Sequence, residues 1–288
     1  MQPTQLHDFG GSGPTLHLAH ANGFPPGTYR PLVERLIGEY HVISLPLRAL
    51  WAGSQPDSAP DWHILADDLL RGLDERGLRG IVGVGHSIGG VLTLYNAVRR
   101  PDLFRAIVLV DPVMLPPSWL WLVRLIRLLR LQRQMPLVRG ALRRRRTWPS
   151  RQESYQYLRG KSFFAAWPDN SLWAYIEAGT RLRTDGEVEL VYPPEWEAHI
   201  FATTPTDVWQ IAPRLHTATL VIRGGRSNTF PARSQAHMAR LAPHVRFAVV
   251  PDAGHMLPLE RPAQTATAIL EFLQRSEAQD PDRNPAEL

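Results

Sequence analysis

The 288-residue sequence contains no cysteine. This absence excludes a disulfide scaffold, a thiol nucleophile and a thiolate metal site. An uninterrupted apolar run is also lacking, because arginine breaks the most apolar stretch, residues 119–131, every three residues. We therefore predict no membrane-spanning segment. The first residues show no basic stretch followed by an apolar run, so we predict no secretory signal and expect a cytoplasmic protein.

Acidic residues are nearly missing from one segment of the chain. Residues 124–161 hold twelve basic residues and one acid, Glu153, while the rest of the chain has 20 basic and 26 acidic residues. Nucleic-acid binding is one interpretation of a basic block. No nucleic-acid motif accompanies this block, so we expect no nucleic-acid partner. The run Arg143 to Arg146 is more typical of a solvated or anion-facing patch than of a specific site.

The composition is that of an ordinary globular protein, with 44% hydrophobic and 20% charged residues. It excludes collagen-like and broadly disordered chains. At about 150 residues per domain the length suggests two domains, and one α/β domain with an insertion fits equally well.

Short apolar runs alternate with segments of helical periodicity, which predicts a mostly parallel sheet covered on both faces. The predicted strands are residues 15–20, 40–45, 80–85, 105–110, 218–224 and 245–251. The predicted helices are residues 29–37, a helix capped by Asp61, and residues 88–99, 231–241 and 259–274. We expect an α/β domain from residues 1–112 and 214–276. A helical cap at 113–213 interrupts it, and a flexible tail follows at 277–288.

Gly85-His86-Ser87-Ile88-Gly89 fits the pattern G-x-S-x-G where a predicted strand meets a helix. A serine on such a sharp turn needs glycine on both sides, and the helix N-terminus faces a developing oxyanion. Ser87 is therefore the candidate nucleophile. The glycines here do not have the G-x-G-x-x-G spacing of a dinucleotide site.

A serine nucleophile needs a base, which is expected late in the chain after the last strand. His255 lies directly behind the strand 245–251, where a loop at the carboxyl edge of the sheet can turn its ring toward Ser87. His17 and His20 lie on a strand and have no third ligand nearby, so we expect no metal site. No cofactor is expected either.

These motifs, with the turn His20-Ala21-Asn22-Gly23-Phe24-Pro25, resemble the α/β-hydrolase superfamily. The resemblance implies an α/β-hydrolase fold with an inserted helical cap. It also implies an oxyanion hole formed by the backbone N–H groups of Phe24 and Ile88. Asn22 departs from the first position of the family's loop and is expected to contact substrate.

The triad acid is open at this point. The family commonly places it in the loop after strand 218–224, where this sequence has Asn228. Asp111 follows strand 105–110, a position from which some members supply the acid, and is one alternative. Asn228 is otherwise either a weakened acid or an orienting group that acts through its side-chain oxygen.

The cap holds seven of the nine tryptophans. We expect Trp119, Trp167 and Trp173 to line an apolar substrate pocket. Residues 119–132 read as a basic amphipathic helix. Its apolar face covers an acyl-binding pocket, or the helix contacts an anionic membrane surface weakly, or it packs on the core with a solvated basic face.

These features predict a serine hydrolase that cleaves small-molecule carboxylic esters with an apolar or aromatic acyl or alkyl group through an acyl-enzyme. Thioester, lactone or carbon–carbon bond hydrolysis would use the same residues. A catalytically weakened binding protein is the alternative from another functional class. The oligomeric state does not follow from the sequence.

Overall fold

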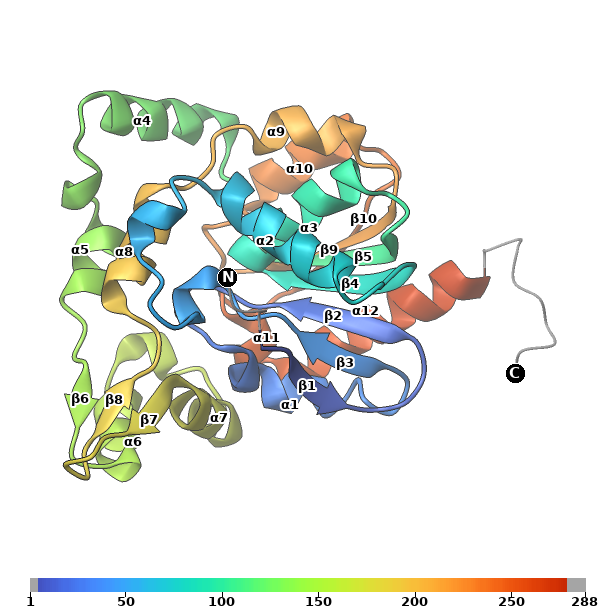
Figure 1. Ribbon diagram of the computed structural model, residues 1–288. Coiled ribbons are helices and arrows are strands. Elements are labelled where there is room, and N and C mark those ends of the chain that lie inside the picture. The colour runs from blue at the N-terminus through green and yellow to red at the C-terminus, as the bar shows by residue number, and fades with distance from the viewer. Residues whose placement is uncertain (1–4, 279–288) are drawn as a thin grey trace.

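The protein, seen in a computed structural model that describes residues 5–278, is built on a seven-stranded sheet (Figure 1). The strand order is β1-β3-β2-β4-β5-β9-β10. Every pairing is parallel except that of β1 with β3. The mostly parallel sheet predicted from the sequence is therefore confirmed. The strands are β1 (His7–Gly10), β2 (Thr15–Ala19), β3 (His41–Ser44), β4 (Ile81–His86), β5 (Phe104–Val110), β9 (Ala218–Gly224) and β10 (Arg246–Val250).

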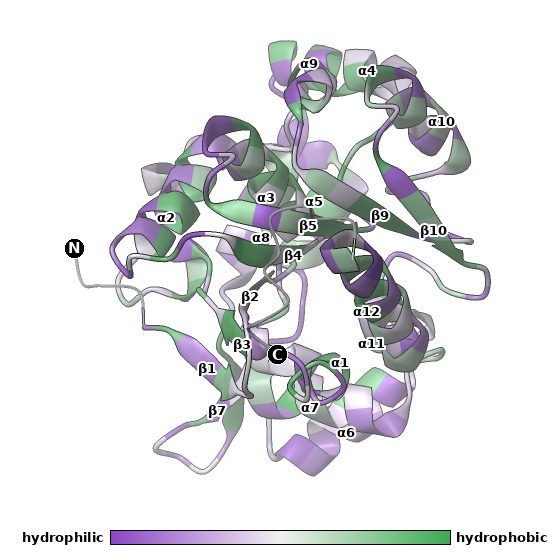
Figure 2. Cartoon of the chain, turned by 90° about the vertical axis from the view of Figure 1, so that its right-hand side faces the viewer, coloured by the Kyte–Doolittle hydropathy of each residue, from purple (hydrophilic) through white to green (hydrophobic). Residues whose placement is uncertain are grey.

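Helices cover both faces of the sheet. One face packs against α2 (Trp62–Asp74), α3 (Ile88–Arg99) and α10 (Ala232–Leu241). The other packs against α1 (Arg30–Val33), α11 (Leu257–Glu260) and α12 (Pro262–Ala278). Side chains alternate between the two cores along each strand, so the central strands are apolar throughout (Figure 2).

Several boundaries differ from the sequence-based expectation, and the single helix expected at residues 259–274 is two helices, α11 and α12, divided at Arg261 before Pro262. The helix expected at residues 29–37 is shorter, because a 3₁₀ turn at Pro26–Tyr29 leads into α1. Strand β1 was not predicted; it is a short edge strand that includes a glycine, and its apolar pattern is weak. Of the expected tail 277–288, the first two residues belong to α12, and the rest lies outside the described residues.

The cap is inserted between β5 and β9, and most of it lies on the left side of Figure 1, with its last helix at the top beside α10. Its helices are α4 (Pro117–Leu128), α5 (Pro136–Leu142), α6 (Arg151–Arg159), α7 (Asp169–Gly179), α8 (Pro194–Ala202) and α9 (Val208–Ile211). It also holds a small antiparallel sheet of β6 (Thr147–Trp148), β8 (Val188–Leu190) and β7 (Thr180–Leu182). The inserted segment is mostly helical, and this small sheet was not expected from the sequence. Between residues 5 and 278, no helix is long and apolar enough to cross a membrane.

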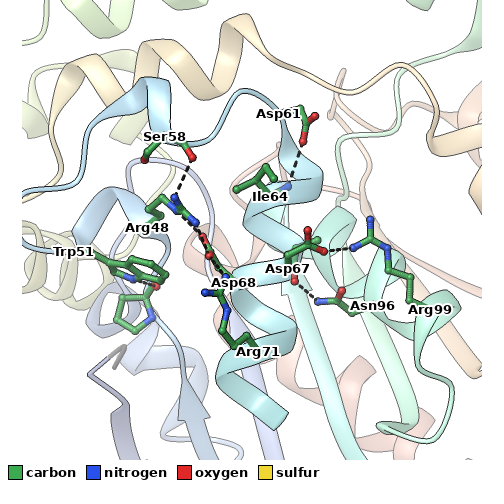
Figure 3. Close-up of polar contacts among 12 residues, drawn as sticks. Arg48, Trp51, Ser58, Asp61, Ile64, Asp67, Asp68, Arg71, Asn96 and Arg99 are labelled. Carbon is green, nitrogen blue, oxygen red and sulfur yellow. Dashed lines mark hydrogen bonds and ion pairs between the residues drawn. The ribbon is translucent and has the colours of Figure 1, made fainter. Parts of the chain in front are cut away.

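The loop after β3 is attached to α2 by a nearly buried ion pair (Figure 3). The Arg48 guanidinium donates two hydrogen bonds of 2.7 Å to the carboxylate of Asp68. A third donor reaches the carbonyl oxygen of Ser58 at 2.9 Å. Planar, two-pronged pairing of this kind sets the direction of both groups. At the start of α2, Asp61 accepts from the N–H groups of His63 and Ile64, which is the N-cap that the sequence predicts.

Candidate active site

Ser87 lies on a sharp turn between β4 and α3. Its backbone has φ 58° and ψ −117°, a combination that is uncommon for a residue with a side chain. The Ser87 N–H donates to the carbonyl oxygen of Val110 on the neighbouring strand at 3.0 Å. Backbone strain that the surrounding structure maintains in this way is typical of functional sites.

Two glycines make this turn possible. A Cβ atom at Gly85 would lie 2.3 Å from the carbonyl oxygen of Gly89. A Cβ atom at Gly89 would lie 2.1 Å from the carbonyl oxygen of Ala19 on β2. Only glycine therefore lets strand, turn and helix approach this closely.

His255 reaches Ser87 from the loop that follows β10. Its Nε2 lies 3.0 Å from Ser87 Oγ, within hydrogen-bond distance. A hydrogen bond to α11 fixes this loop, because the Gly254 N–H donates to the Glu260 carboxylate at 2.8 Å. The structure thus brings together the two residues that the sequence motifs single out.

Asp111 contacts the other nitrogen of the same ring. His255 Nδ1 lies 2.7 Å from Asp111 Oδ2, and the Asp111 side chain is 0% exposed. The Gly224 N–H donates to Asp111 Oδ1 at 3.0 Å, and the Ser227 hydroxyl donates to Oδ2. Like Ser87, Asp111 has a positive φ, at 43°. The carboxylate is therefore anchored by β9 and its loop while it accepts from His255.

Asn228 lies one residue beyond this arrangement and is exposed. The His255 Nδ1 already has Asp111 as its partner, and no hydrogen bond joins Asn228 to His255 among the described residues. Both interpretations that gave Asn228 a direct role on the imidazole are therefore wrong for this geometry. Ser227, which sequence reasoning missed, is the residue of this loop that contacts the carboxylate.

The two expected oxyanion donors come from two different parts of the α/β domain. Ile88 is the first residue of α3, where the backbone N–H has no partner inside the helix. Phe24 lies in the turn after β2, and its N–H donates weakly to the carbonyl oxygen of Ala21 at 3.3 Å. Both residues line the same cavity as Ser87.

A buried hydrogen-bond chain connects this turn to the histidine loop. The Ala21 N–H donates to the Tyr29 hydroxyl at 3.0 Å, and the hydroxyl donates to His86 Nδ1 at 2.7 Å. His86 Nε2 in turn donates to the carbonyl oxygen of His255 at 3.0 Å. Burial, and next the nearby charge of His255, lower the pKa of His86 well below its ordinary value. His86 is therefore a neutral connector, and sequence reasoning gave it no role.

His20 fixes the same turn from the other side. Its Nδ1 donates to the Ala21 carbonyl oxygen at 2.8 Å, and its Nε2 accepts from the Leu47 N–H at 3.0 Å. His17 Nε2 accepts from the Leu45 N–H at 3.1 Å. Burial lowers the pKa of His20 to about 4 and that of His17 to about 3. Both imidazoles are neutral in the folded protein at neutral pH.

These two histidines predict a loss of stability between pH 6.5 and pH 4. Below about pH 6.5 the unfolded chain binds protons that the folded imidazoles do not, so the folded state is disfavoured as the pH falls. From pH 7 to pH 5 the free energy of unfolding should drop by about 2 kcal/mol for each of them. Urea unfolding at several pH values measures this. The variant His17→Gln should show a shallower slope, and equal slopes in the two proteins would contradict the assignment.

Ser87 and His255 face a cavity of about 730 Å³ between the α/β domain and the cap. Ser87, Ile88, His255 and Met256 come from the α/β domain. The cap contributes side chains that are mostly apolar, together with four cations and one acid. These cap residues include Val123, Met135, Leu137, Trp148, Phe164, Ile200, Phe201, Arg143, Arg144, Arg145, Lys161 and Glu197. Such a cavity accommodates an apolar group of ordinary ligand size.

The tryptophans expected in the pocket lie elsewhere. Trp119 is largely exposed and stacks under the guanidinium of Arg233. Trp167 is buried in an aromatic cluster of the cap, and Trp173 stacks on Tyr155. None of the three lines the cavity. Trp62 and Trp148 line it instead, and Asn22 lies in the wall as expected.

Metal-ligating groups are not clustered in this part of the chain. Across residues 5–278, no group of three or more His, Asp or Glu side chains is placed to hold a metal ion.

The comparisons with known proteins agree with this architecture. A protein of Alternaria alternata described as abhydrolase domain-containing is 26% identical over 233 residues, covering 68% of this chain and 84% of its own length. N-formylmaleamate deformylase of Pseudomonas putida is 26% identical over 264 residues, covering 87% and 85%. The crystal structure of E-2-(acetamidomethylene)succinate hydrolase superposes with a TM-score of 0.79 at 21% identity, covering 93% of this chain and 94% of that one.

The sequence pattern of the alpha/beta hydrolase family matches residues 18–268. This range runs from β2 through Ser87, Asp111 and the cap to His255. The chain belongs to the alpha/beta hydrolase family.

Proposed function

We propose that this protein is a serine hydrolase that cleaves carboxylic esters with an apolar acyl or alkyl group. The observation that carries the proposal is the continuous chain Ser87 Oγ, His255 and Asp111, with contacts of 3.0 and 2.7 Å. Its open end faces an apolar cavity. Nucleophile, base and orienting carboxylate in this order are the arrangement that acyl transfer requires.

In the proposed reaction, Ser87 Oγ attacks the ester carbonyl carbon while His255 Nε2 takes the hydroxyl proton. Asp111 accepts from Nδ1–H, which holds the ring in the tautomer that presents a free Nε2 and stabilises the imidazolium. The N–H groups of Ile88 and Phe24 donate to the oxyanion. The tetrahedral intermediate expels the alcohol, which receives the proton from His255. Water, deprotonated by His255, then releases the acid and restores Ser87.

The contact between Asp111 and His255 argues against the alternative of a catalytically weakened binding protein. That alternative rests on the asparagine at position 228, and the carboxylate of Asp111 supplies the charge that asparagine lacks. A buried carboxylate next to a partly exposed imidazole favours an intact base over a disabled one.

The structure constrains the type of bond that is cleaved less than it constrains the catalytic residues. Two of the proteins compared above are named for deformylation of N-formylmaleamate and hydrolysis of E-2-(acetamidomethylene)succinate. A structure described as an enol-lactonase has the same fold. Thioester, lactone and carbon–carbon bond hydrolysis therefore stay as alternatives to ester hydrolysis, because the same residues serve each of them.

A chain-length series of p-nitrophenyl esters tests the ester proposal. We expect kcat/KM to rise from the acetyl ester to a medium-chain ester, because each methylene that enters an apolar cavity contributes about 0.8 kcal/mol. A thioester and a lactone of matched size serve as competitors. If the protein turns over the thioester or the lactone but none of the p-nitrophenyl esters, that reaction replaces ester hydrolysis as the proposed function. Inertness toward all three would contradict the proposal.

Gly140 offers a way to connect this preference to the cavity. It lies in the cavity wall on α5, and a Cβ atom there would meet nothing within 4 Å. We expect Gly140→Phe to lower kcat/KM for the longest ester by about tenfold and to change the acetyl ester by less than about twofold. Gly140→Ala is the matched control. An equal loss for every ester in Gly140→Phe would show that this cavity does not hold the acyl chain.

A further inference from the structure

Large apolar side chains are exposed in one region of the cap. Nine of the eleven exposed large hydrophobic residues of the described chain lie between positions 119 and 163. They are Trp119, Trp121, Leu122, Leu125, Leu128, Leu129, Leu137, Leu142 and Phe163. Single exposed leucines are normal on a protein surface, whereas a group of this size marks an interaction site.

Helix α4 carries most of these residues. An amphipathic helix usually turns its apolar side toward the core, whereas α4 turns it toward the solvent. Five of them follow helical spacing along one side of α4 and its end: Trp121, Leu122, Leu125, Leu128 and Leu129. We call these five residues the apolar face of α4. Trp121 is 69% exposed and Leu128 is 79% exposed. In Figure 1 the helix lies along the outer edge of the cap.

The two arginines of α4 bind backbone carbonyl groups of the cap, and Arg124 also lies over the Trp121 ring, 5.2 Å from its centroid. Arg124 donates to the carbonyl oxygen of Thr206 at 2.9 Å, and Arg127 donates to that of Thr204. The sequence-based expectations of a solvated basic face, and of an apolar face covering the pocket, were therefore wrong. Val123 is the only residue of α4 in the cavity wall among the described residues. Two inward guanidinium groups bonded to backbone carbonyls hold the apolar face outward.

Cations without carboxylate partners follow this face along the chain, at the end of α4 and on α5. Arg130, Arg133, Arg139 and Arg143 form no ion pair with any described residue. No acidic residue occurs between positions 103 and 152 of the sequence except Asp111, which is buried, and the two acids that α8 brings beside α5, Glu195 and Glu197, are paired with Arg146 and Arg144. The surface field around α4 and α5 is therefore positive, and it selects a partner that is both anionic and apolar.

We propose that α4 and α5 form a docking face for an anionic lipid bilayer, with the apolar face of α4 in the boundary between headgroups and acyl chains. An amphipathic helix with aromatic and leucine side chains on one side and arginines beside them suits this location. A second copy of the chain fits less well, because an isologous contact would bring the same unpaired arginines together.

The docking face adjoins the cavity. Leu137 and Phe163 line the cavity and are both more than half exposed, so they lie on its rim. Arg143 and Lys161 are exposed residues of the same wall. A bilayer in contact with α5 would therefore lie beside the entrance through which an apolar substrate passes.

Vesicle co-sedimentation of the whole protein tests the proposal without measuring activity, so it is independent of the proposed reaction. We expect binding to vesicles of phosphatidylcholine with about one third phosphatidylserine, and much weaker binding to pure phosphatidylcholine. Leu125→Ser/Leu128→Ser should lower the partition coefficient by at least about tenfold. Arg130→Gln/Arg133→Gln/Arg139→Gln should lower it by roughly a hundredfold, and added salt should do the same.

A matched control is available in Leu182→Ser/Val249→Ser, because both residues are exposed and lie outside the docking face. This control should bind vesicles like the unchanged protein. A cooperative thermal unfolding transition shows that each variant is folded. If the leucine variant does not fold, the arginine variant still tests the proposal. No binding to either vesicle, or equal loss in the control, would overturn the proposal. So would a dimer that Leu125→Ser/Leu128→Ser dissociates, without vesicle binding, since a second copy would then cover the face.

Discussion

Turnover of a p-nitrophenyl ester should fall by about 10⁶-fold when Ser87 is replaced by alanine, because no other group can form the acyl-enzyme. Ser87 Oγ is the atom that lies 3.0 Å from His255 Nε2 at the cavity floor. Steady-state kinetics with the preferred ester measures the loss. The substitution removes one oxygen from a partly enclosed position, so the melting temperature should change little.

Ser118→Ala is the matched control for this experiment, because Ser118 is exposed at the start of α4. It should retain turnover within about twofold. Turnover by Ser87→Ala above about one thousandth of the original rate would contradict the assignment of Ser87 as nucleophile.

The second large effect is expected at Asp111. We predict that Asp111→Asn lowers kcat by about 10⁴-fold, the size of effect found for the same exchange in serine proteases. An amide at this position can donate where His255 needs an acceptor, which favours the wrong tautomer of the ring. It also lacks the charge that stabilises the imidazolium. The pH dependence of kcat, measured with the same ester, reports the change in the base.

Asn228→Ala gives the comparison that separates the two candidate acids. Asn228 is exposed and has no hydrogen bond to His255, so this variant should keep kcat within about twofold. A large loss in Asn228→Ala with a small loss in Asp111→Asn would assign the role to position 228 instead.

The α/β domain was predictable because its central strands are buried on both faces. Continuous apolar runs such as residues 105–110 have no solvated side, which identifies them in the sequence as parallel strands. The edge strand β1 has half-exposed side chains and a glycine, and it carries no such signal.

Ser87 and His255 were predictable because local motifs place them at the carboxyl edge of the sheet. The acid was not, because β5 and β9 are neighbours and both end at this edge. The loops that hold Asp111 and Asn228 therefore begin side by side at this edge. The choice depends on loop details, namely the positive φ of Asp111 and the Ser227 hydroxyl, that leave no clear pattern in the sequence.

The cap shows the limit of periodicity. The spacing of residues 119–131 predicts one basic and one apolar side of a helix, but periodicity does not say which side faces the protein. Carbonyl groups of Thr204 and Thr206, about 80 residues away in the chain, bind the arginines and decide the orientation. The tryptophans were misplaced because the sequence does not show their partners: Trp119 lies against Arg233 of α10, and Trp173 stacks on Tyr155 of α6.

The proposed reaction requires that Asp111 and His255 together activate Ser87, and the rate of labelling by a fluorophosphonate measures this activation. We expect rapid labelling of the unchanged protein, with the adduct located on Ser87 by mass spectrometry. Labelling should be slowed by several orders of magnitude in Asp111→Asn and unchanged in Asn228→Ala. No adduct on Ser87, or equal labelling rates in all three proteins, would show that these residues do not activate Ser87.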